Sequence, residues 1–147
     1  MELIEIIIAC AIASIGFLIG KFIQGFAKEE VKKGSKIIKI IQDVIYGVIL
    51  VFLFMIFDIN LIISLFLATA ITIFSLVKTK KPKIIRILIM AITLASTFKT
   101  KFFLIISGTI FIYALMNGMI EKNWKDVIKK TALLLILSLL LIYLRKI

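Results

Sequence analysis

Asp43 is the residue best placed to do chemistry, because its ionisable side chain lies inside a long apolar segment, residues 37–57. If this segment crosses a membrane as a helix, a carboxylate within it indicates a functional site, such as a pathway for a solute or an ion. An ordinary ion pair is the structural alternative, because Lys39 stands four residues earlier and therefore on the same helical face. The sequence leaves both interpretations open.

Other polar residues could share such a pathway. A second apolar segment, residues 102–120, carries Asn117 four positions after Tyr113, so a helix presents both side chains on one face. An asparagine in a membrane helix also commonly hydrogen-bonds across a helix interface, which is the structural alternative here. The candidate polar pathway comprises Asp43, Gln42, Tyr46, Tyr113 and Asn117.

The chain is poor in the side chains that catalysis and metal binding use. It contains no histidine and a single cysteine, Cys10, which lies within the first apolar segment. A histidine-assisted nucleophile, a histidine-ligated metal and a site of several thiolates are therefore excluded. We expect no enzyme activity, no metal and no cofactor. A lipid-processing enzyme that uses acidic residues near the lipid headgroups is the remaining enzymatic alternative.

The overall composition is that of a membrane protein. Of the 147 residues, 63% are hydrophobic, and the mean hydropathy is +1.20. A soluble domain averages roughly half apolar residues, and so large an excess would leave exposed patches that aggregate. The net charge of +11 comes from lysine clusters between the apolar segments without interleaved aromatic residues, which argues against nucleic-acid binding. The sequence predicts a single transmembrane domain over residues 1–147, surrounded by the lipid bilayer, with no soluble domain.

Six continuous apolar segments predict an all-α, polytopic membrane protein. A transmembrane β-strand alternates apolar and polar residues, whereas these segments are apolar throughout, and a helix satisfies its own backbone hydrogen bonds in lipid. The fourth segment is the weakest, because a helix over residues 84–98 extends only about 22 Å against roughly 30 Å of hydrocarbon. Five spans plus a re-entrant segment are therefore the alternative to six. The expected helices cover residues 3–26, 37–57, 61–77, 84–98, 102–120 and 131–144.

The connections between these helices are expected to be short. Residues 58–60 are too few for anything but a tight turn, so the second and third helices should form a hairpin. Residues 27–36 are mostly polar, and we expect a link there in which Gly34 and Ser35 make the turn and cap before the next helix. Neither connection is long enough to divide the chain into domains.

Positive charge is distributed unevenly between the two sides of this six-helix arrangement. Fifteen of the nineteen basic residues fall on one side and four on the other. By the positive-inside rule the richer side is cytoplasmic, so both termini are predicted to lie on the non-cytoplasmic side of the cell membrane. Trp124, which stands among charged residues, is predicted to be an interfacial anchor. The basic residues on the poorer side are Lys99, Lys101, Arg145 and Lys146.

Small residues recur at helical spacing on two segments and predict close helix packing. Gly16 and Gly20 are four residues apart, which lets another backbone approach closely. Packing within the chain is the ordinary interpretation, and docking onto a second copy or a larger membrane complex is the alternative. The helix-packing seam comprises Ala9, Ala13, Gly16 and Gly20 on the first helix and Ser64, Ala68, Thr72 and Ser75 on the third.

These features predict a small multi-pass membrane protein that acts as a transporter or channel-like permeation unit for a small solute or ion. The alternative is a non-catalytic accessory subunit of a larger membrane complex, which would leave the small-residue face of the first helix exposed. Three helices followed by three of opposite orientation could also form an inverted repeat, a geometry common in transporters. The two functions differ in their requirements, since a transporter needs polar groups that converge on a water-filled cavity near the middle of the membrane, whereas an accessory subunit needs a wide exposed small-residue face on the first helix.

Overall fold

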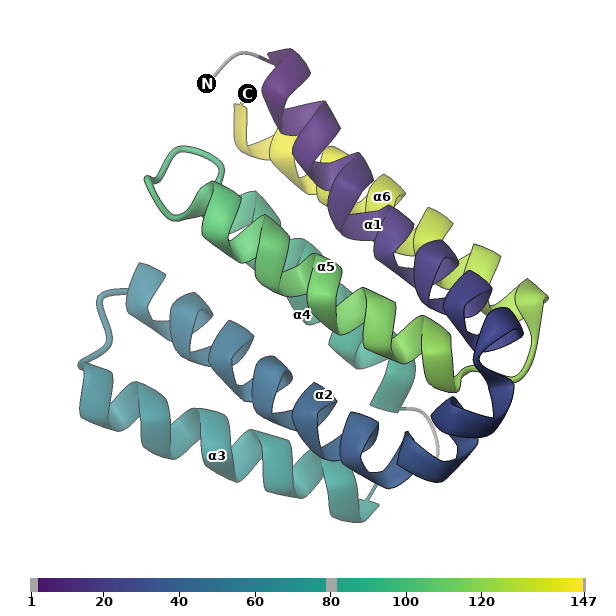
Figure 1. The fold of residues 1–147 in the computed structure, drawn as a ribbon. Coiled ribbons are helices and arrows are strands. Elements are labelled where there is room, and N and C mark those ends of the chain that lie inside the picture. The colour runs from purple at the N-terminus through teal and green to yellow at the C-terminus, as the bar shows by residue number, and fades with distance from the viewer. Residues whose placement is uncertain (1–2, 79–81, 147) are drawn as a thin grey trace.

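The computed structural model describes residues 3–78 and 82–146, with side chains described for residues 4–73 and 84–145. All regular structure in these ranges is helical, so the prediction of an all-α bundle is confirmed. Figure 1 shows the six helices, which are α1 (Leu3–Phe26), α2 (Lys28–Ile56), α3 (Leu61–Lys78), α4 (Pro82–Thr97), α5 (Phe103–Ile120) and α6 (Trp124–Lys146).

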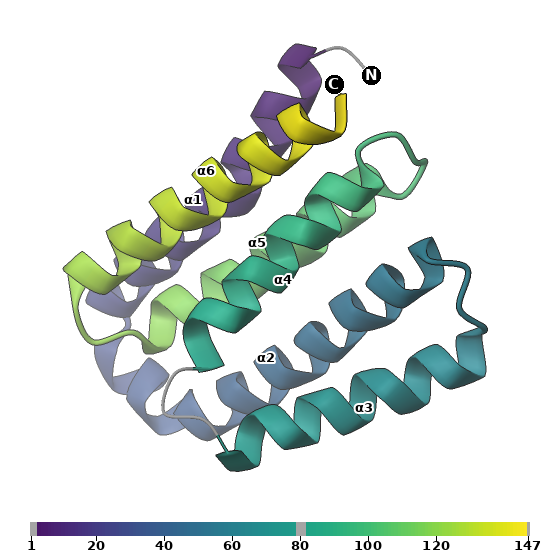
Figure 2. The ribbon, with the colours of Figure 1, turned by 180° about the vertical axis from the view of Figure 1, so that it is seen from behind.

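Successive helices run in opposite directions, so that the two termini lie together at one end of the bundle (Figure 1). The most extensive helix contact is between α1 and α5, and α1 also packs on α6. On the opposite face, α4 contacts both α6 and α2, while α3 lies at the far edge against α2 (Figure 2). The core is therefore built mainly from α1, α4 and α5, and α3 is largely exposed.

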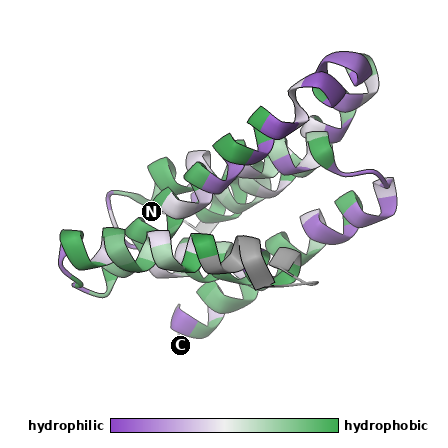
Figure 3. Ribbon diagram, turned by 90° about the horizontal axis from the view of Figure 1, so that it is seen from below, coloured by the Kyte–Doolittle hydropathy of each residue, from purple (hydrophilic) through white to green (hydrophobic). Residues whose placement is uncertain are grey.

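The helices have the length and surface of membrane helices. Apolar side chains cover the outside of the bundle, Ile62 and Phe66 of α3 among the most exposed, and hydrophilic residues gather mainly at the helix ends and connections (Figure 3). This distribution indicates a membrane protein. Among the residues whose side chains are described, four helical stretches are long and apolar enough to cross a membrane, Ile4–Phe26, Lys28–Ile56, Phe103–Ile120 and Trp124–Arg145, and two are shorter, Leu61–Ile73 and Ile84–Thr97.

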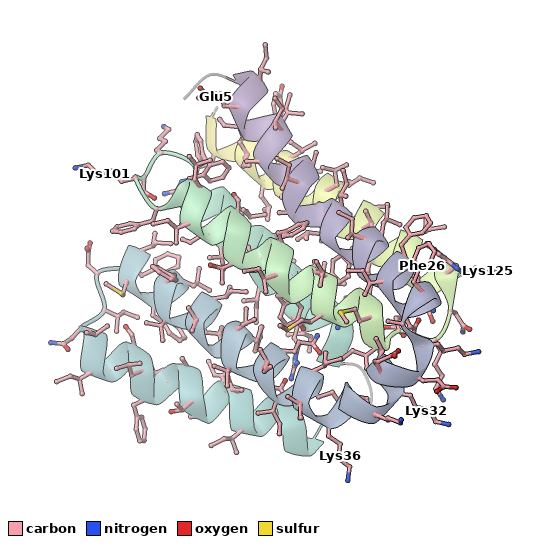
Figure 4. All side chains as sticks on the ribbon, viewed as in Figure 1. Glu5, Phe26, Lys32, Lys36, Lys101 and Lys125 are labelled. Carbon is pink, nitrogen blue, oxygen red and sulfur yellow. The ribbon has the colours of Figure 1, made fainter. Side chains whose placement is uncertain are left out.

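Basic residues gather at one end of the bundle. Figure 4 shows Lys32, Lys36 and Lys125 at the end opposite Glu5 and Lys101. The lysines of residues 78–83 lie outside the residues whose side chains the structure describes. We call the end where α1 meets α2 and α5 meets α6 the lysine-rich end, and its exposed lysines are Lys28, Lys32, Lys33, Lys36, Lys122, Lys125 and Lys129.

The prediction of a polar link over residues 27–36 is wrong, because residues 28–36 belong to a helix. α2 begins at Lys28, so Ala27 alone separates it from α1. The backbone hydrogen bonds continue through this residue, from Ala27 N to Ile23 O at 2.9 Å and from Val31 N to Ala27 O at 2.9 Å. The first two helices therefore meet at an elbow one residue long.

Local helix energetics explain why this segment does not form a turn. Glu29 and Glu30 lie in the first turn of α2, where negative charge is favourable against the helix dipole. Gly34 and Ser35 stand inside the helix, and one glycine costs a helix only about 1 kcal/mol. Val31 is buried and fixes the segment to the bundle. A glycine therefore does not end the helix here.

The tight turn predicted at residues 58–60 is present. Asp58 adopts a φ of 57°, a left-handed conformation that aspartate tolerates better than most residues. The Asn60 side chain begins α3, because its Oδ1 accepts a hydrogen bond from Ile62 N at 2.9 Å. This turn brings α3 back along α2 as a hairpin.

α4, expected to be the weakest span, lies in the interior of the bundle. Its 16 residues extend about 24 Å, and Met90, Ala91 and Leu94 are fully buried. The turn from α4 into α5 lies at the same end of the bundle as both termini (Figure 1). Because α2, α5 and α6 surround much of this helix, protein contacts take the place that lipid has around the longer helices.

α1 and α5 approach so closely that their backbones touch. A Cβ added at Gly20 would lie 1.9 Å from the Leu115 carbonyl oxygen, and one added at Gly16 would lie 2.5 Å from another α5 carbonyl oxygen. Gly118 makes the reciprocal approach from α5, with an added Cβ 2.1 Å from the Phe17 carbonyl oxygen. The small-residue face of α1 is therefore covered within the chain.

The other seam residues also lie against neighbouring helices. Thr72 of α3 is half-buried, and a Cβ added at Gly47 of α2 would lie 3.6 Å from its Oγ1. Ser75 falls outside the residues whose side chains are described. The small residues of α3 thus serve its packing on α2. The buried members of the seam are Ala9, Ala13, Gly16, Gly20, Ser64 and Ala68.

The two halves of the chain do not pack alike. α4 packs along α6, whereas the corresponding helices of the first half, α1 and α3, lie on opposite sides of the bundle (Figures 1 and 2). This arrangement gives no support to an inverted repeat.

Candidate functional site

Asp43 forms an ion pair with Arg86 between α2 and α4. The Arg86 Nη1 donates a hydrogen bond to Asp43 Oδ1 at 2.7 Å, and the side chains are 12% and 20% exposed, respectively. A hydrogen bond between two charged groups is roughly twice as strong as one between neutral groups. The pair therefore joins two helices whose contributing residues are 43 positions apart.

Three more polar side chains surround this pair. The guanidinium carbon of Arg86 lies 4.8 Å from the centroid of the Tyr46 ring. Tyr113 of α5 lies close to Arg86, and its ring is 6.1 Å from that of Tyr46. Gln42, Tyr46 and Tyr113 are all buried. We call Gln42, Asp43, Tyr46, Arg86 and Tyr113 the Arg86 cluster.

The ion pair of Asp43 is thus not the one with Lys39 that the sequence suggests. The Lys39 side chain is exposed, one helical turn nearer to the lysine-rich end. A lysine in that place can extend its amine to water along the helix surface. Arg86, enclosed by three helices, needs a counter-charge nearby, because a buried charge without one is strongly destabilising.

Asp43 also lines an apolar groove between α2 and α3. The groove has a volume of about 710 Å³, and Asp43 is the single charged residue among the described residues that line it. Ile40 and Met55 mark its two ends on α2, and Thr69 and Thr72 lie in its α3 wall. Asp43 is the one member of the Arg86 cluster that lines this groove.

Asn117 does not join the Arg86 cluster, although it lies one turn from Tyr113. The Lys130 Nζ donates a hydrogen bond to Asn117 Oδ1 at 2.6 Å and forms an ion pair with Glu121. Both Lys130 and Glu121 are buried. The five predicted pathway residues are therefore divided, with four around Arg86 and one in a second polar cluster nearer the lysine-rich end.

Lys21 binds the connection that follows α5. Its Nζ donates hydrogen bonds to the carbonyl oxygens of Glu121 at 2.7 Å and Lys122 at 2.9 Å, and a third to Gln24 Oε1. These two carbonyl groups lie just after α5, where Glu121 is extended, and a backbone carbonyl group that is removed from water needs a hydrogen-bond donor. This contact fixes the end of α1 against the connection between α5 and α6.

The two clusters form a polar line along α5. Tyr113, Asn117 and Glu121 are spaced four residues apart, so they lie on one face of the helix over about 12 Å. The line begins at the lysine-rich end and leads to Arg86. Polar side chains that follow one another through a membrane helix are typical of solute and proton pathways.

Trp124 begins α6 at the lysine-rich end. Its side chain is exposed, and its ring lies edge-on to Phe22 with the centroids 5.1 Å apart. An exposed tryptophan at the end of an apolar helix has the placement of an interfacial anchor.

Lys130→Met should lower the free energy of unfolding by about 1–3 kcal/mol, because it removes the ammonium group beside the buried Glu121 carboxylate. Lys129→Met is the matched control, since Lys129 precedes it on α6 but is exposed, and it should change stability by less than about 0.5 kcal/mol. Thermal unfolding in detergent, followed by circular dichroism, measures both variants. Equal losses of stability in the two variants would show that the buried pair of Lys130 and Glu121 adds nothing to stability.

The sequence pattern did not indicate the interior roles of Arg86 and Gly118, nor those of Lys21, Glu121 and Lys130. Counting basic residues by side assigns Arg86 to the lysine-rich side without showing that it faces inward. The signal for its role is that α4 contains no acidic residue, so a charge within it must find its partner on another helix. Gly118 could have been recognised as a second small residue in an apolar segment, able to meet the glycines of the first.

Comparison with known proteins adds no further information, because no protein-family model, curated protein or solved structure shows significant similarity to this chain. Within the described ranges there is no group of three or more histidine, cysteine, aspartate or glutamate residues that could hold a metal ion. The function has to be inferred from the geometry of the Arg86 cluster and the surfaces around it.

Proposed function

We propose that this chain is a multi-pass protein of the cell membrane that acts as a transporter or channel-like permeation unit for a small solute or ion. The observation that supports it most is the convergence of polar side chains from α2 and α5 on Arg86 of α4. One ion pair would be enough to join α2 to α4. The cluster adds three further polar side chains, and polar groups are costly in a membrane interior unless they serve a function.

In the proposed mechanism, the Arg86 cluster is a binding site whose own groups pair when no solute is present. An anionic group of a solute would bind the Arg86 guanidinium, and a cationic group would bind the Asp43 carboxylate, each replacing part of the ion pair. Gln42 and Tyr113 would supply hydrogen bonds that water supplies outside the membrane. The polar line on α5 would connect this site with the lysine-rich end.

We further propose that the lysine-rich end is cytoplasmic and that both termini face away from the cytoplasm. The excess of lysine at this end supports the orientation through the positive-inside rule. The two termini lie at the same end of the bundle, which supports an even number of membrane crossings (Figure 1).

A non-catalytic accessory subunit is the second candidate. The exposure of α3 favours it, because this helix packs mainly on α2 and leaves apolar residues such as Ile62 and Phe66 on its outer side. The face of α1 that an accessory subunit would offer to a partner is covered by α5. We therefore rank permeation first.

Flux into proteoliposomes tests the permeation proposal. Over a panel of ions and small charged solutes, the parent chain should carry at least one, and Asp43→Asn should reduce that flux at least about tenfold, on the order of 1.4 kcal/mol in the barrier. The reason is that the variant removes the charge that balances Arg86 in the binding site.

Asp58→Asn is the matched control for this experiment. It makes the same chemical change at an exposed turn residue whose φ of 57° asparagine also adopts readily, so its flux should equal that of the parent chain. Absence of flux for every solute, or an equal reduction in both variants, would favour the accessory subunit.

A further inference from the structure

A second cavity lies at the lysine-rich end, where α1 passes into α2 and α5 passes into α6. Its volume is about 610 Å³, and no member of the Arg86 cluster lines it. Its described lining contains no aspartate or glutamate. The charged and aromatic residues that line it are Lys21, Lys28, Lys122, Phe22, Phe26 and Trp124.

The three lysines of this cavity have different roles. The Lys21 ammonium group is occupied by two carbonyl oxygens and by Gln24, so it forms a fixed part of the wall. Lys28 and Lys122 are exposed, and none of the hydrogen bonds or ion pairs found among the described residues involves their ammonium groups. These two groups are therefore free to bind an anion in the cavity.

Two helices also begin at this cavity. Lys28 is the first residue of α2, whose N-terminus has no side-chain cap, and Trp124 is the first residue of α6. The first backbone N–H groups of a helix carry partial positive charge and favour anions. Glu29, Glu30 and Asp126 lie in the same first turns, but their side chains do not line the cavity.

The other part of the cavity is apolar and faces outward. Phe26 is 91% exposed, and Figure 4 shows it at the lysine-rich end of the bundle. Phe22 is exposed beside it and packs edge-on against Trp124. Gly25 leaves open space, because no heavy atom would lie within 4 Å of a Cβ added there. A ligand that fits the whole cavity combines an anionic group with hydrocarbon.

We propose that this cavity binds an anionic phospholipid, with Lys28 and Lys122 around the phosphate group and an acyl chain along Phe22 and Phe26. Phosphate oxygens accept strong charge-assisted hydrogen bonds from ammonium groups. Basic pockets between membrane helices are suited to such headgroups. Inorganic phosphate shares the headgroup chemistry but has no chain to occupy the aromatic side. This site is distinct from the proposed permeation pathway and does not depend on it.

Trp124 allows a direct test, because it is the only tryptophan of the chain and lines the cavity. In phosphatidylcholine bilayers, phosphatidylglycerol with brominated acyl chains should quench its fluorescence more strongly than an equal fraction of brominated phosphatidylcholine. The double variant Lys28→Gln and Lys122→Gln should reduce this preference at least about fivefold, because it removes both ammonium groups that bind the phosphate in the cavity. Equal quenching by the two lipids in the parent chain, which needs no variant, would overturn the proposal.

Lys32→Gln with Lys125→Gln is the matched control. It removes the same charge from the same end of the protein, but neither residue lines the cavity, so most of the preference for phosphatidylglycerol should remain. An equal loss in the two double variants would show that the attraction is spread over the surface, and it would overturn the proposal. Displacement of the lipid by inorganic phosphate, at constant ionic strength, would assign the cavity to a free anion instead.

Discussion

Gly20→Ala should destabilise the protein by about 1–3 kcal/mol or more, because a Cβ at this position would meet the backbone of α5. The added atom would lie 1.9 Å from the Leu115 carbonyl oxygen and 3.0 Å from Met119 N, and neither can move without moving the helix. Gly118→Ala should have a similar effect from the other side, since its Cβ would lie 2.1 Å from the Phe17 carbonyl oxygen. Thermal unfolding in detergent measures the change.

Gly108→Ala is the control for these two variants. It lies on the same helix as Gly118, but a Cβ there would have no heavy atom within 4 Å. Alanine is a better helix former than glycine by up to about 1 kcal/mol, so this variant should be as stable as the parent chain or slightly more stable. If Gly20→Ala and Gly108→Ala unfolded at the same temperature, the close approach of α1 and α5 would not hold the bundle together.

Arg86→Gln should lower the free energy of unfolding by about 3 kcal/mol, because it leaves the Asp43 carboxylate inside the bundle without this counter-charge. Asp43→Asn should lower the free energy of unfolding by a similar amount, because it leaves the Arg86 guanidinium without the Asp43 counter-charge. The double variant should lose less than the sum of the two, by about 1–3 kcal/mol, since the residues are in direct contact. Unfolding measurements on the parent chain, both single variants and the double variant give this coupling energy.

Arg145→Gln is a control for the loss of an arginine. Arg145 is exposed near the opposite end of the bundle, where its Nη1 donates a hydrogen bond to the Ala95 carbonyl oxygen at 3.0 Å, so its replacement should cost about 1 kcal/mol or less. Additive losses at Asp43 and Arg86 would contradict the pairing described here. A stable double variant would also be informative in the flux assay, because it keeps the fold while both charges of the proposed site are absent.

Much of the fold could be predicted from local pattern. The six helices follow from continuous apolar segments, because only a helix or a closed barrel satisfies the backbone in lipid and these segments do not alternate as barrel strands do. The hairpin at residues 58–60 follows from the shortness of the connection. The prediction of a turn at residues 27–36 is wrong, because polar residues and a glycine can continue a helix when their charges are favourable against the helix dipole.

Part of the candidate site could be predicted as well. A charged residue in an apolar helix identifies Asp43, and adjacency and helical spacing identify Gln42, Tyr46 and Tyr113. The same spacing placed Asn117 with them, although it contacts Lys130 instead. Helical spacing states which face a residue occupies, but it does not state which helix that face meets.

The sequence by itself therefore determined the class of the protein, its helices and its charged end, because these depend on composition and on contacts within a few residues. Only the tertiary structure decided that Asp43 pairs with Arg86 rather than Lys39, and that Lys21 binds the Glu121 carbonyl group 100 positions away. It also decided that the glycines of α1 meet α5. The physical reason is that these contacts depend on which helices become neighbours, and the packing of all six helices together sets that choice.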